Sequence, residues 1–519
     1  MSLRPEDLPQ DVESLQALVL SQAVRIEALE ISLKTLSGMI FGPRSERASA
    51  VLDNQMLLDL DDLSSVAPPA AANDDEADQN RKPARKSGKR NVGQLPKWLA
   101  RVDRILEPHD KACPCCAGEL HKIAESVSES LDIIPPVLRV LRLIRPRYAC
   151  RACTNGVVQA PAPPRALTGG MASTRMLAYV AVSRFSWNLP LNRQTEMLKG
   201  MGITLDRSTL SRWMTSVAWW LRPLYDRQLQ IMHSHPRIFC DETRMPVLKK
   251  GQSRVHLEQF WAHATDDSGW NGPVPCCVAF IHASGRGHKE IREQLADFHG
   301  VVQVDGYASY NGLTVAGRKA GPIELAYCLA HARRKFTDIH KQTASAFSAD
   351  IIARLRQVYA IEARIRGQNA CRRRIVRQVE TAPVMQALKV ALEAELVLVS
   401  SQSKTAKAIG YVLGLWSGLT LFLSDGRLEV DNNTVERNMR TVAIGRRNSL
   451  FAGSEGGAET WAIIASLLAT CRLNGVDPFT WLNDVLVKMV SGAVKSQDLD
   501  QLLPWNWRPA EHGAMPLAA

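Results

Sequence analysis

The fold is decided by the stretch PRIFCDETRMPVL (residues 236–248) and by the segments that follow it. These are three further stretches with strand character and one helical stretch: HLEQFWAHATDD (256–267), VPCCVAFIHAS (274–284), GVVQVDGYASY (300–310) and the helical GHKEIREQLADF (287–298). Strands followed by a helix and another strand predict a mixed α/β sheet. We therefore place the first part of an α/β core at residues 233–325.

Three acidic residues stand out against this pattern. Asp241 ends the apolar run IFCDET, Asp305 ends VVQVDGY, and Glu436 lies in a polar helix start, DNNTVERNMR. Two carboxylates buried at the ends of neighbouring strands are costly unless a cation compensates them. Carboxylate oxygens suit Mg²⁺, and two such ions serve phosphodiester chemistry. The pattern predicts a catalytic site in which these residues hold two Mg²⁺ or Mn²⁺ ions, in an enzyme that cuts and joins nucleic acid.

Each acidic residue also has a structural interpretation. Asp305 precedes Gly306, and Asp-Gly is an ordinary turn signal. Glu436 follows Asn433 by three residues, which fits a capping box equally well, and Asp431 competes as the third ligand. Basic residues on the same helix favour Glu436, because arginine beside a metal carboxylate suits phosphate clamping. The predicted phosphate contacts there are Arg437, Arg440, Arg446 and Arg447.

A second basic segment, CLAHARRKF (328–336), reads as a helix with one histidine in its first turn. We predict that His331 orients a scissile phosphate and that Arg333, Arg334 and Lys335 hold the DNA backbone. A helix start with a solvated basic face is the alternative.

Two cysteine pairs, CPCC (113–116) and CRAC (150–153), predict one structural Zn²⁺. In a reducing compartment such pairs indicate metal binding rather than disulfides. The stretch VLRVLRLIRPRYAC supplies strands between them, in a zinc-ribbon DNA-binding domain at 106–165. Ordinary buried cysteines are the alternative, with Cys115 spare and His109 and His121 as poorer substitutes. The expected zinc ligands are Cys113, Cys116, Cys150 and Cys153.

The N-terminal residues carry a heptad pattern over 8–40, with β-branched residues in one position and leucine in the other. This favours a parallel two-stranded coiled coil at 1–45, and hence a homodimer, over an amphipathic helix packed on its own chain. Residues 46–105 read as a disordered linker, whose basic tract RKPARKSGKR (81–90) either tracks DNA phosphates or is a solvated tether.

Helical periodicity dominates the remaining segments. Within 166–232, the piece MLKGMGITLDRSTLSRWM fits a helix-turn-helix whose second helix begins near Ser208. That helix would offer Arg207, Ser208 and Arg212 to DNA. The alternative is an ordinary pair of helices joined by a glycine turn, which is common in any helical bundle. The other predicted segments are a helical insertion (326–425), the second part of the core with the third acidic residue (426–465) and a C-terminal helical segment (466–519).

Composition sets limits on the class of protein. A chain of 519 residues exceeds one ordinary core, so we expect several domains. The net charge of +12 and the pI of about 9.2 favour a polyanionic partner. No secretory signal is visible, and the longest apolar stretch, YVLGLWSGLTLFL, is too short to span a bilayer. We expect a cytoplasmic protein without a membrane partner.

Long ordered motifs resemble one known family. CDET, VDGYASYNGL, CLAHARRKF, the stretch from DGRLEVDNN to LFAGSEGG, and LLPWNW are similar to the TnpC-type transposases of the IS66 insertion sequences. LKTLSGMIFGPRSERA, RPRYACRAC with PAPPR, and NLPLNRQTEML resemble the family's leucine-zipper, zinc-finger and following regions. Ser309 replaces a usual glycine, and Ser449 stands where an aromatic residue is common.

The resemblance implies a multidomain α+β protein: an N-terminal coiled coil, a zinc ribbon, a helical DNA-binding region, and an RNase H-like core with a helical insertion. It implies a DDE transposase whose catalytic triad is Asp241, Asp305 and Glu436. DNA would be the partner, as terminal inverted repeats and as target, and small companion proteins of the element would accompany a nucleoid-associated bacterial enzyme. The alternatives are an RNase H-like nuclease or resolvase, and a zinc-ribbon regulator with an inactive core.

Overall fold

The computed structural model describes residues 138–149, 157–249, 251, 254–315 and 317–509. They fall into two compact units, one ending at Ala162 and one starting at Pro163. The predicted coiled coil (1–45), the predicted linker (46–105) and the four cysteines predicted to bind zinc lie outside the described residues.

The smaller unit contains a short antiparallel pair of strands. β1 (Arg147–Ala149) pairs with β2 (Val157–Gln159). Gln159 extends the pairing, since its amide donates to the carbonyl of Arg145 at 2.8 Å. The strand expected before the second cysteine pair is therefore present over three residues.

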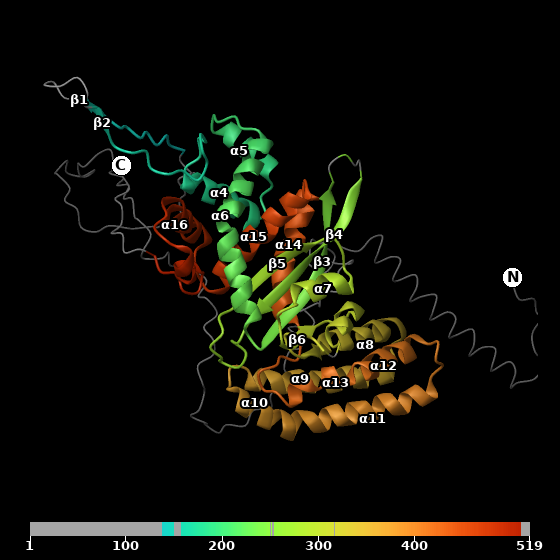
Figure 1. The fold of residues 1–519 in the computed structure, drawn as a ribbon. Coiled ribbons are helices and arrows are strands. Elements are labelled where there is room, and N and C mark those ends of the chain that lie inside the picture. The colour runs from blue at the N-terminus through green and yellow to red at the C-terminus, as the bar shows by residue number, and fades with distance from the viewer. Residues whose placement is uncertain (1–137, 150–156, 250, 252–253, 316, 510–519) are drawn as a thin grey trace, which may run out of the picture. The chain divides into compact units, whose positions relative to one another are not determined.

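The larger unit is built on one mixed sheet of five strands in the order β5-β4-β3-β6-β7 (Figure 1). The first three strands pair antiparallel, and β6 and β7 continue the sheet in parallel from β3. The predicted mixed sheet is thus confirmed, and one strand, β7, was not predicted. The strands are β3 (Arg237–Leu248), β4 (Val255–Thr265), β5 (Cys277–Ala283), β6 (Gly300–Val304) and β7 (Ile323–Tyr327).

The strand predicted over 300–310 is shorter than expected. β6 stops at Val304, and a 3₁₀ helix, η2 (Ala308–Leu313), follows. Gly306 lies between them with φ +94°, a conformation that turns the chain out of the sheet and that only glycine adopts without strain.

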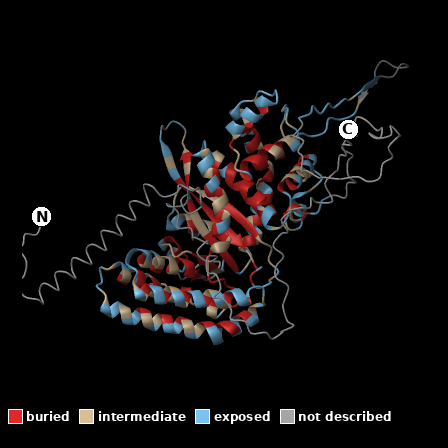
Figure 2. Ribbon diagram, turned by 180° about the vertical axis from the view of Figure 1, so that it is seen from behind, coloured by how far each residue is buried: buried red, intermediate tan, exposed pale blue. Residues whose placement is uncertain are grey.

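The two faces of the sheet are covered by different elements. Phe239 and Phe260 face the main core, which α6 (Arg207–His233) and α15 (Glu455–Leu473) complete. Ile238 and Trp261, one residue along each strand, belong to a second core beneath α7 (His288–Gln294) and η2. This alternation is the period-two pattern of a sheet buried on both sides (Figure 2).

Helices precede and follow the sheet, as predicted for 166–232 and for the C-terminus. The first group is α4 (Thr174–Phe185), α5 (Leu191–Gly200) and α6, which begins at Arg207. The last group is α14 (Asn433–Ser449), α15, α16 (Pro478–Ser491) and η5 (Ser496–Leu502). α15 continues across the position at which we divided the core from the C-terminal segment.

The predicted helical insertion forms a helical layer with its own core. Phe336, Leu355 and Leu388 are among the residues that fill it. Buried and exposed residues alternate along these helices, so one side of each faces the layer and one faces solvent (Figure 2). The helices are α8 (Leu329–Thr343), α9 (Ala346–Ile365), α10 (Ala370–Val376), the π-helical turn η3 (Arg377–Thr381), α11 (Ala382–Leu398), α12 (Lys404–Gly414), α13 (Trp416–Leu419) and η4 (Leu421–Leu423).

Within the described part of the chain, no single helix is long and apolar enough to cross a membrane. Only the pair Lys404–Gly414 and Trp416–Leu423 reaches that length and hydropathy together, and its two parts meet at 71°.

Candidate active site

Strand register brings the first two acidic residues side by side. Asp305 follows the end of β6 as predicted, but Asp241 lies within β3 and not at its end, because β3 continues to Leu248 in its pairing with β4. Phe239 of β3 pairs with Gln303 of the parallel strand β6. Two residues further along both chains, the same register places Asp241 beside Asp305. Neighbouring strands are about 4.8 Å apart, and residues two apart share a face, so both side chains start on the face that carries Phe239.

Local hydrogen bonds fix both carboxylates. Asp241 Oδ1 accepts the N–H of Glu242 at 2.8 Å, and Asp305 Oδ1 accepts the N–H of Tyr307 at 2.8 Å. The carbonyl of Asp305 accepts a third bond, from the hydroxyl of Tyr411 in the helical insertion, at 3.0 Å. The insertion thus supports the turn after β6 directly.

The third acidic residue comes from α14. Glu436 lies in the first turn of the helix and is buried. The cap residue before the helix, Asn432, fastens it to the sheet, since its side-chain amide donates to the carbonyl of Cys240 at 2.8 Å. The carbonyl of Val430 accepts the N–H of Leu329 at 2.9 Å, which ties the same segment to the start of α8.

The negative charges of Glu436 and Asp305 act on Asp241, although the three carboxylates do not all lie within 4.8 Å of one another in the described structure. Burial raises the pKa of Asp241 well above its usual value, and the negative charges of Glu242, Glu436 and Asp305 raise it further. We call Asp241, Asp305 and Glu436 the carboxylate cluster, and the role of Glu436 as its third ligand stays a prediction.

Hydrogen bonds at the helix start give Asp431 a local structural role. The N–H of Asn433 donates to Asp431 Oδ1 at 3.1 Å, and its side-chain amide donates to Oδ2 at 2.8 Å. Asp431 thus satisfies the helix start, in the place that a capping box would give to Glu436. Burial raises the pKa of Asp431 to about 6.

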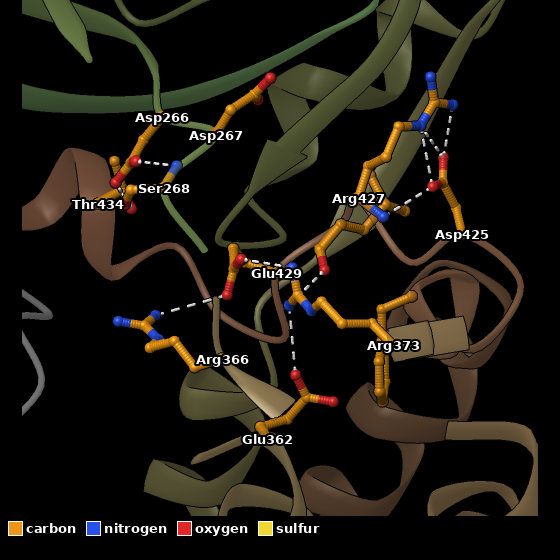
Figure 3. Close-up of polar contacts among 12 residues, drawn as sticks. Asp266, Asp267, Ser268, Glu362, Arg366, Arg373, Asp425, Arg427, Glu429 and Thr434 are labelled. Carbon is orange, nitrogen blue, oxygen red and sulfur yellow. Dashed lines mark hydrogen bonds and ion pairs between the residues drawn. The ribbon is translucent and has the colours of Figure 1, made fainter. Parts of the chain in front are cut away.

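A buried ionic cluster holds the segment that leads into α14 (Figure 3). Gln303 of β6 donates to the carbonyl of Glu429 at 2.8 Å and accepts its N–H at 3.1 Å. The carboxylate of Glu429 receives Arg373 of α10 at 3.0 Å, and Arg373 also contacts Glu362 at 3.4 Å. Arg377 pairs with both oxygens of Glu362 at 2.8 Å. We call Glu362, Arg373, Arg377 and Glu429 the arginine clamp.

Arg377 also forms hydrogen bonds to the backbone of the segment that precedes α14. Its guanidinium donates to the carbonyls of Phe422, Asp425 and Leu428 at 2.9, 3.1 and 2.9 Å. The side chain is 0% exposed and that of Arg373 1%. These arginines of the insertion, which sequence alone leaves as a basic run, are internal supports of the site.

The residues predicted to contact phosphate differ in how far their side chains are exposed. His331 is buried, with Nδ1 3.8 Å from Glu436 Oε1. The ammonium group of Lys335 lies over the ring of Tyr411, 4.2 Å from its centre. Arg446 is half-buried against β3 and donates to Thr243 and to the carbonyl of Arg244. Arg333, Arg334 and Arg440 are half-buried, and Arg437 and Arg447 are exposed.

The donor set of the carboxylate cluster fits Mg²⁺. Its members offer only oxygen atoms, and Asp241 is surrounded by negative charge that a divalent cation would neutralise. Glu242 differs, because Arg286 donates to it at 2.8 Å and the hydroxyl of Tyr310 at 2.8 Å. The charge of Glu242 is therefore balanced by Arg286, whereas the charges that act on the neighbouring Asp241 are negative.

Comparison with known families assigns the chain. The family model described as Transposase IS66 family matches residues 169–460, more than half of the sequence. The chain belongs to the IS66 transposase family. Three more models match other parts of this transposase: Transposase C of IS166 homeodomain at 28–104, the zinc-finger binding domain of transposase IS66 at 110–154, and the IS66 C-terminal element at 466–505. The zinc-finger match spans all four predicted cysteine ligands.

Three proteins of Sinorhizobium fredii are similar to the transposase over nearly their whole length. Uncharacterized protein y4jD is 51% identical over 517 residues, covering 99% of both chains. Uncharacterized protein y4qI is 37% identical over 545 residues (98% of this chain, 99% of the relative) and y4hP 34% over 514 residues (95% and 91%).

Sequence reasoning missed several residues that shape the transposase site. Glu242 and Tyr310 stood inside quoted motifs, CDET and VDGYASYNGL, without a role. Gln303 carried a signal, because it is a polar residue within the buried run VVQV. The sequence gives no signal for the roles of Arg373 and Glu362, since their pairing depends on how the insertion folds.

Proposed function

We propose that this IS66-family protein is a DDE transposase with an RNase H-like core that cleaves DNA at the ends of an insertion sequence and joins them to target DNA. The observation that supports the proposal is that the charges of Asp305, after β6, and Glu436, in α14, act on buried Asp241 of β3, the central strand of the mixed sheet β5-β4-β3-β6-β7. A buried carboxylate whose pKa is raised by two neighbouring negative charges fits a site built to hold divalent cations.

The chemistry divides between the carboxylates and the basic residues. Asp241, Asp305 and Glu436 would hold two Mg²⁺ ions, which when bound supply Lewis-acid stabilisation and an activated water. The turn at Gly306 and the arginine clamp keep the ligands in place, because phosphoryl transfer depends mainly on positioning. Arg437 and Arg447, which are exposed, would hold the DNA backbone.

Two reactions follow at the same site. In the first, water attacks the phosphodiester at the element end, and the bond to the 3′ oxygen breaks and leaves a free 3′-OH. In the second, that 3′-OH attacks a phosphodiester of target DNA, so one P–O bond forms as another breaks.

The other parts would prepare the DNA for this chemistry. The zinc ribbon, with Cys113, Cys116, Cys150 and Cys153 as ligands, and the helix pair α5–α6 would grip the terminal inverted repeats. The α6 start suits this role, since Arg207, Ser208 and Arg212 are exposed there. A coiled coil at 1–45 would pair two protomers in the bacterial cytoplasm, with companion proteins of the element as further partners.

A joining assay tests the proposal. The full-length protein is incubated with Mg²⁺, labelled element ends and a plasmid, beside Asp241→Asn, Glu436→Gln and Asp431→Asn. We expect joined products from wild type and a loss of joining activity of at least roughly 100-fold in Asp241→Asn and Glu436→Gln. Asp431→Asn should join at a near-normal rate, because it weakens only a helix-start interaction worth about 1 kcal/mol of stability.

The alternatives give different outcomes in the same assay. Cleavage without joining indicates an RNase H-like nuclease or resolvase. Specific binding without either activity indicates a regulator with an inactive core. If Asp431→Asn loses joining and Glu436→Gln keeps it, the third ligand is Asp431.

A further inference from the structure

A second group of potential metal ligands lies beside the carboxylate cluster and has a different chemistry. Cys328, His331 and Glu436 are all buried, and one ligand atom from each lies within 4.8 Å of the others. Among the described residues, no other three His, Cys, Asp or Glu side chains meet this condition.

Helix geometry explains why the three meet. Cys328 is the cap residue of α8, and His331 follows three residues later, so both side chains lie on one face of its first turn. Glu436 comes from the first turn of α14, which faces them. His331 Nδ1 and Glu436 Oε1 are 3.8 Å apart, close to the ~3.4 Å that separates nitrogen and oxygen ligands around a tetrahedral Zn²⁺.

The surroundings of the sulfur suit a metal-bound thiolate. The N–H of Asn432 donates to Cys328 Sγ at 3.3 Å, and the N–H of His331 also bonds to this sulfur. Burial and the negative charges of Glu436 and Asp431 raise the pKa of the thiol, whereas these two donors act in the opposite direction. Such N–H groups orient a thiolate ligand and offset its charge.

A buried polar group on α9 is a further partner for an ion bound here. The hydroxyl of Tyr359, on α9, is buried and forms no hydrogen bond within the described residues. Burial raises its pKa, and the charges of Asp431, Cys328 and Glu436 raise it further, so it lies near the cluster. It could bond a water molecule in the fourth position of a tetrahedral site.

We propose that Cys328, His331 and Glu436 form a binding site for a thiophilic divalent cation of the Zn²⁺ class, separate from the oxygen-only Mg²⁺ site. Thiolate and imidazole select such ions, whereas Mg²⁺ prefers oxygen. On binding, the Cys328 S–H bond breaks, its proton goes to solvent, and the sulfur becomes a ligand.

The two sites share one ligand, so they are coupled. This part of the inference rests on the proposed function: a Zn²⁺ ion that holds Glu436 toward α8 withdraws it from Asp241 and Asp305. The site would then act as an inhibitory metal site of the transposase.

Zinc content measures the site without any activity assay. The full-length protein is dialysed against a metal buffer with fixed free Zn²⁺ and excess Mg²⁺, and zinc per chain is measured by mass spectrometry of the metal. We expect Cys328→Ser to hold one zinc ion fewer than wild type. The matched control Cys471→Ser removes a buried cysteine of α15 and is expected to hold as much zinc as wild type.

The difference between variants is the readout, so the zinc of the cysteine pairs at 113–116 and 150–153 does not affect it. Equal zinc in wild type and Cys328→Ser overturns the proposal. If circular dichroism shows that Cys328→Ser is unfolded, His331→Gln replaces it with the same two outcomes. The joining assay with Mg²⁺ alone is run in parallel, so a failed transposase proposal and a failed zinc proposal are distinguishable.

Discussion

At the scale of single residues, Asp241 and Glu242 are adjacent in the chain but have opposite surroundings. Glu242 is compensated by Arg286 and Tyr310, whereas the charges near Asp241 are negative. Because strand neighbours point to opposite faces, one residue became a structural support and the other a candidate metal ligand.

The first prediction concerns Asp241→Asn in metal-free protein. The folded-state pKa of Asp241 is raised, so its contribution to stability is fully present below the unfolded pKa and is lost as pH rises through the folded pKa. Asparagine cannot ionise. We therefore expect the variant to unfold at a higher temperature than wild type at neutral pH, with the difference disappearing in acid.

Thermal unfolding across pH, with and without Mg²⁺, checks this expectation. Mg²⁺ should raise the unfolding temperature of wild type more than that of the variant. The control Asp338→Asn changes an exposed aspartate of α8 and should match wild type. A variant that is less stable than wild type at neutral pH would contradict the charge argument.

A second prediction concerns Gly306, which turns the chain after β6. At φ +94°, an added Cβ would lie 2.7 Å from the hydroxyl of Tyr411 and 2.9 Å from Leu415 Cδ1. We expect Gly306→Ala to cost roughly 1–3 kcal/mol of stability, measured by denaturant unfolding. Gly410→Ala, in α12 with no atom near its added Cβ, should instead stabilise by about 0.5–1 kcal/mol.

At the scale of elements, the helical insertion supports the third catalytic candidate. The arginine clamp joins α9, α10 and η3 to the segment before α14. The π-helical turn begins at Arg377, and such turns change the direction in which side chains leave a helix. The insertion is therefore part of the site and more than a spacer within the sheet domain.

The third prediction compares two arginines of this layer. Arg377→Ala leaves Glu362 buried with a partner missing, and we expect a loss of about 3–5 kcal/mol. Arg364→Ala breaks an exposed pair with Glu380 and should cost at most about 1 kcal/mol. Urea unfolding of both variants decides, and similar losses would show that the clamp is not a special support.

At the scale of the whole molecule, the heptad pattern at the N-terminus predicts that two chains associate. We expect full-length protein to be a dimer by light scattering and the protein lacking residues 1–45 to be a monomer. The circular dichroism of the shortened protein, reduced only by the removed helix, serves as the control. A dimer that persists after the deletion would assign the contact to another surface.

The sequence by itself determined the order of strands and helices, because period two and period 3.6 are local properties. It also singled out Asp241 and Asp305 as candidate ligands, since each directly follows a buried apolar run. It did not find β7, a five-residue strand, or the end of β6 at Val304.

Only the tertiary structure showed that Glu436 and Asp431 have different surroundings. Both fit the local spacing, but Asp431 accepts the bonds of the helix start, while the charge of Glu436 acts on Asp241. The arginine clamp and the Cys328–His331–Glu436 group were likewise beyond the sequence. Their members come from separate helices, and contacts between distant segments arise only when the helical layer packs against the sheet.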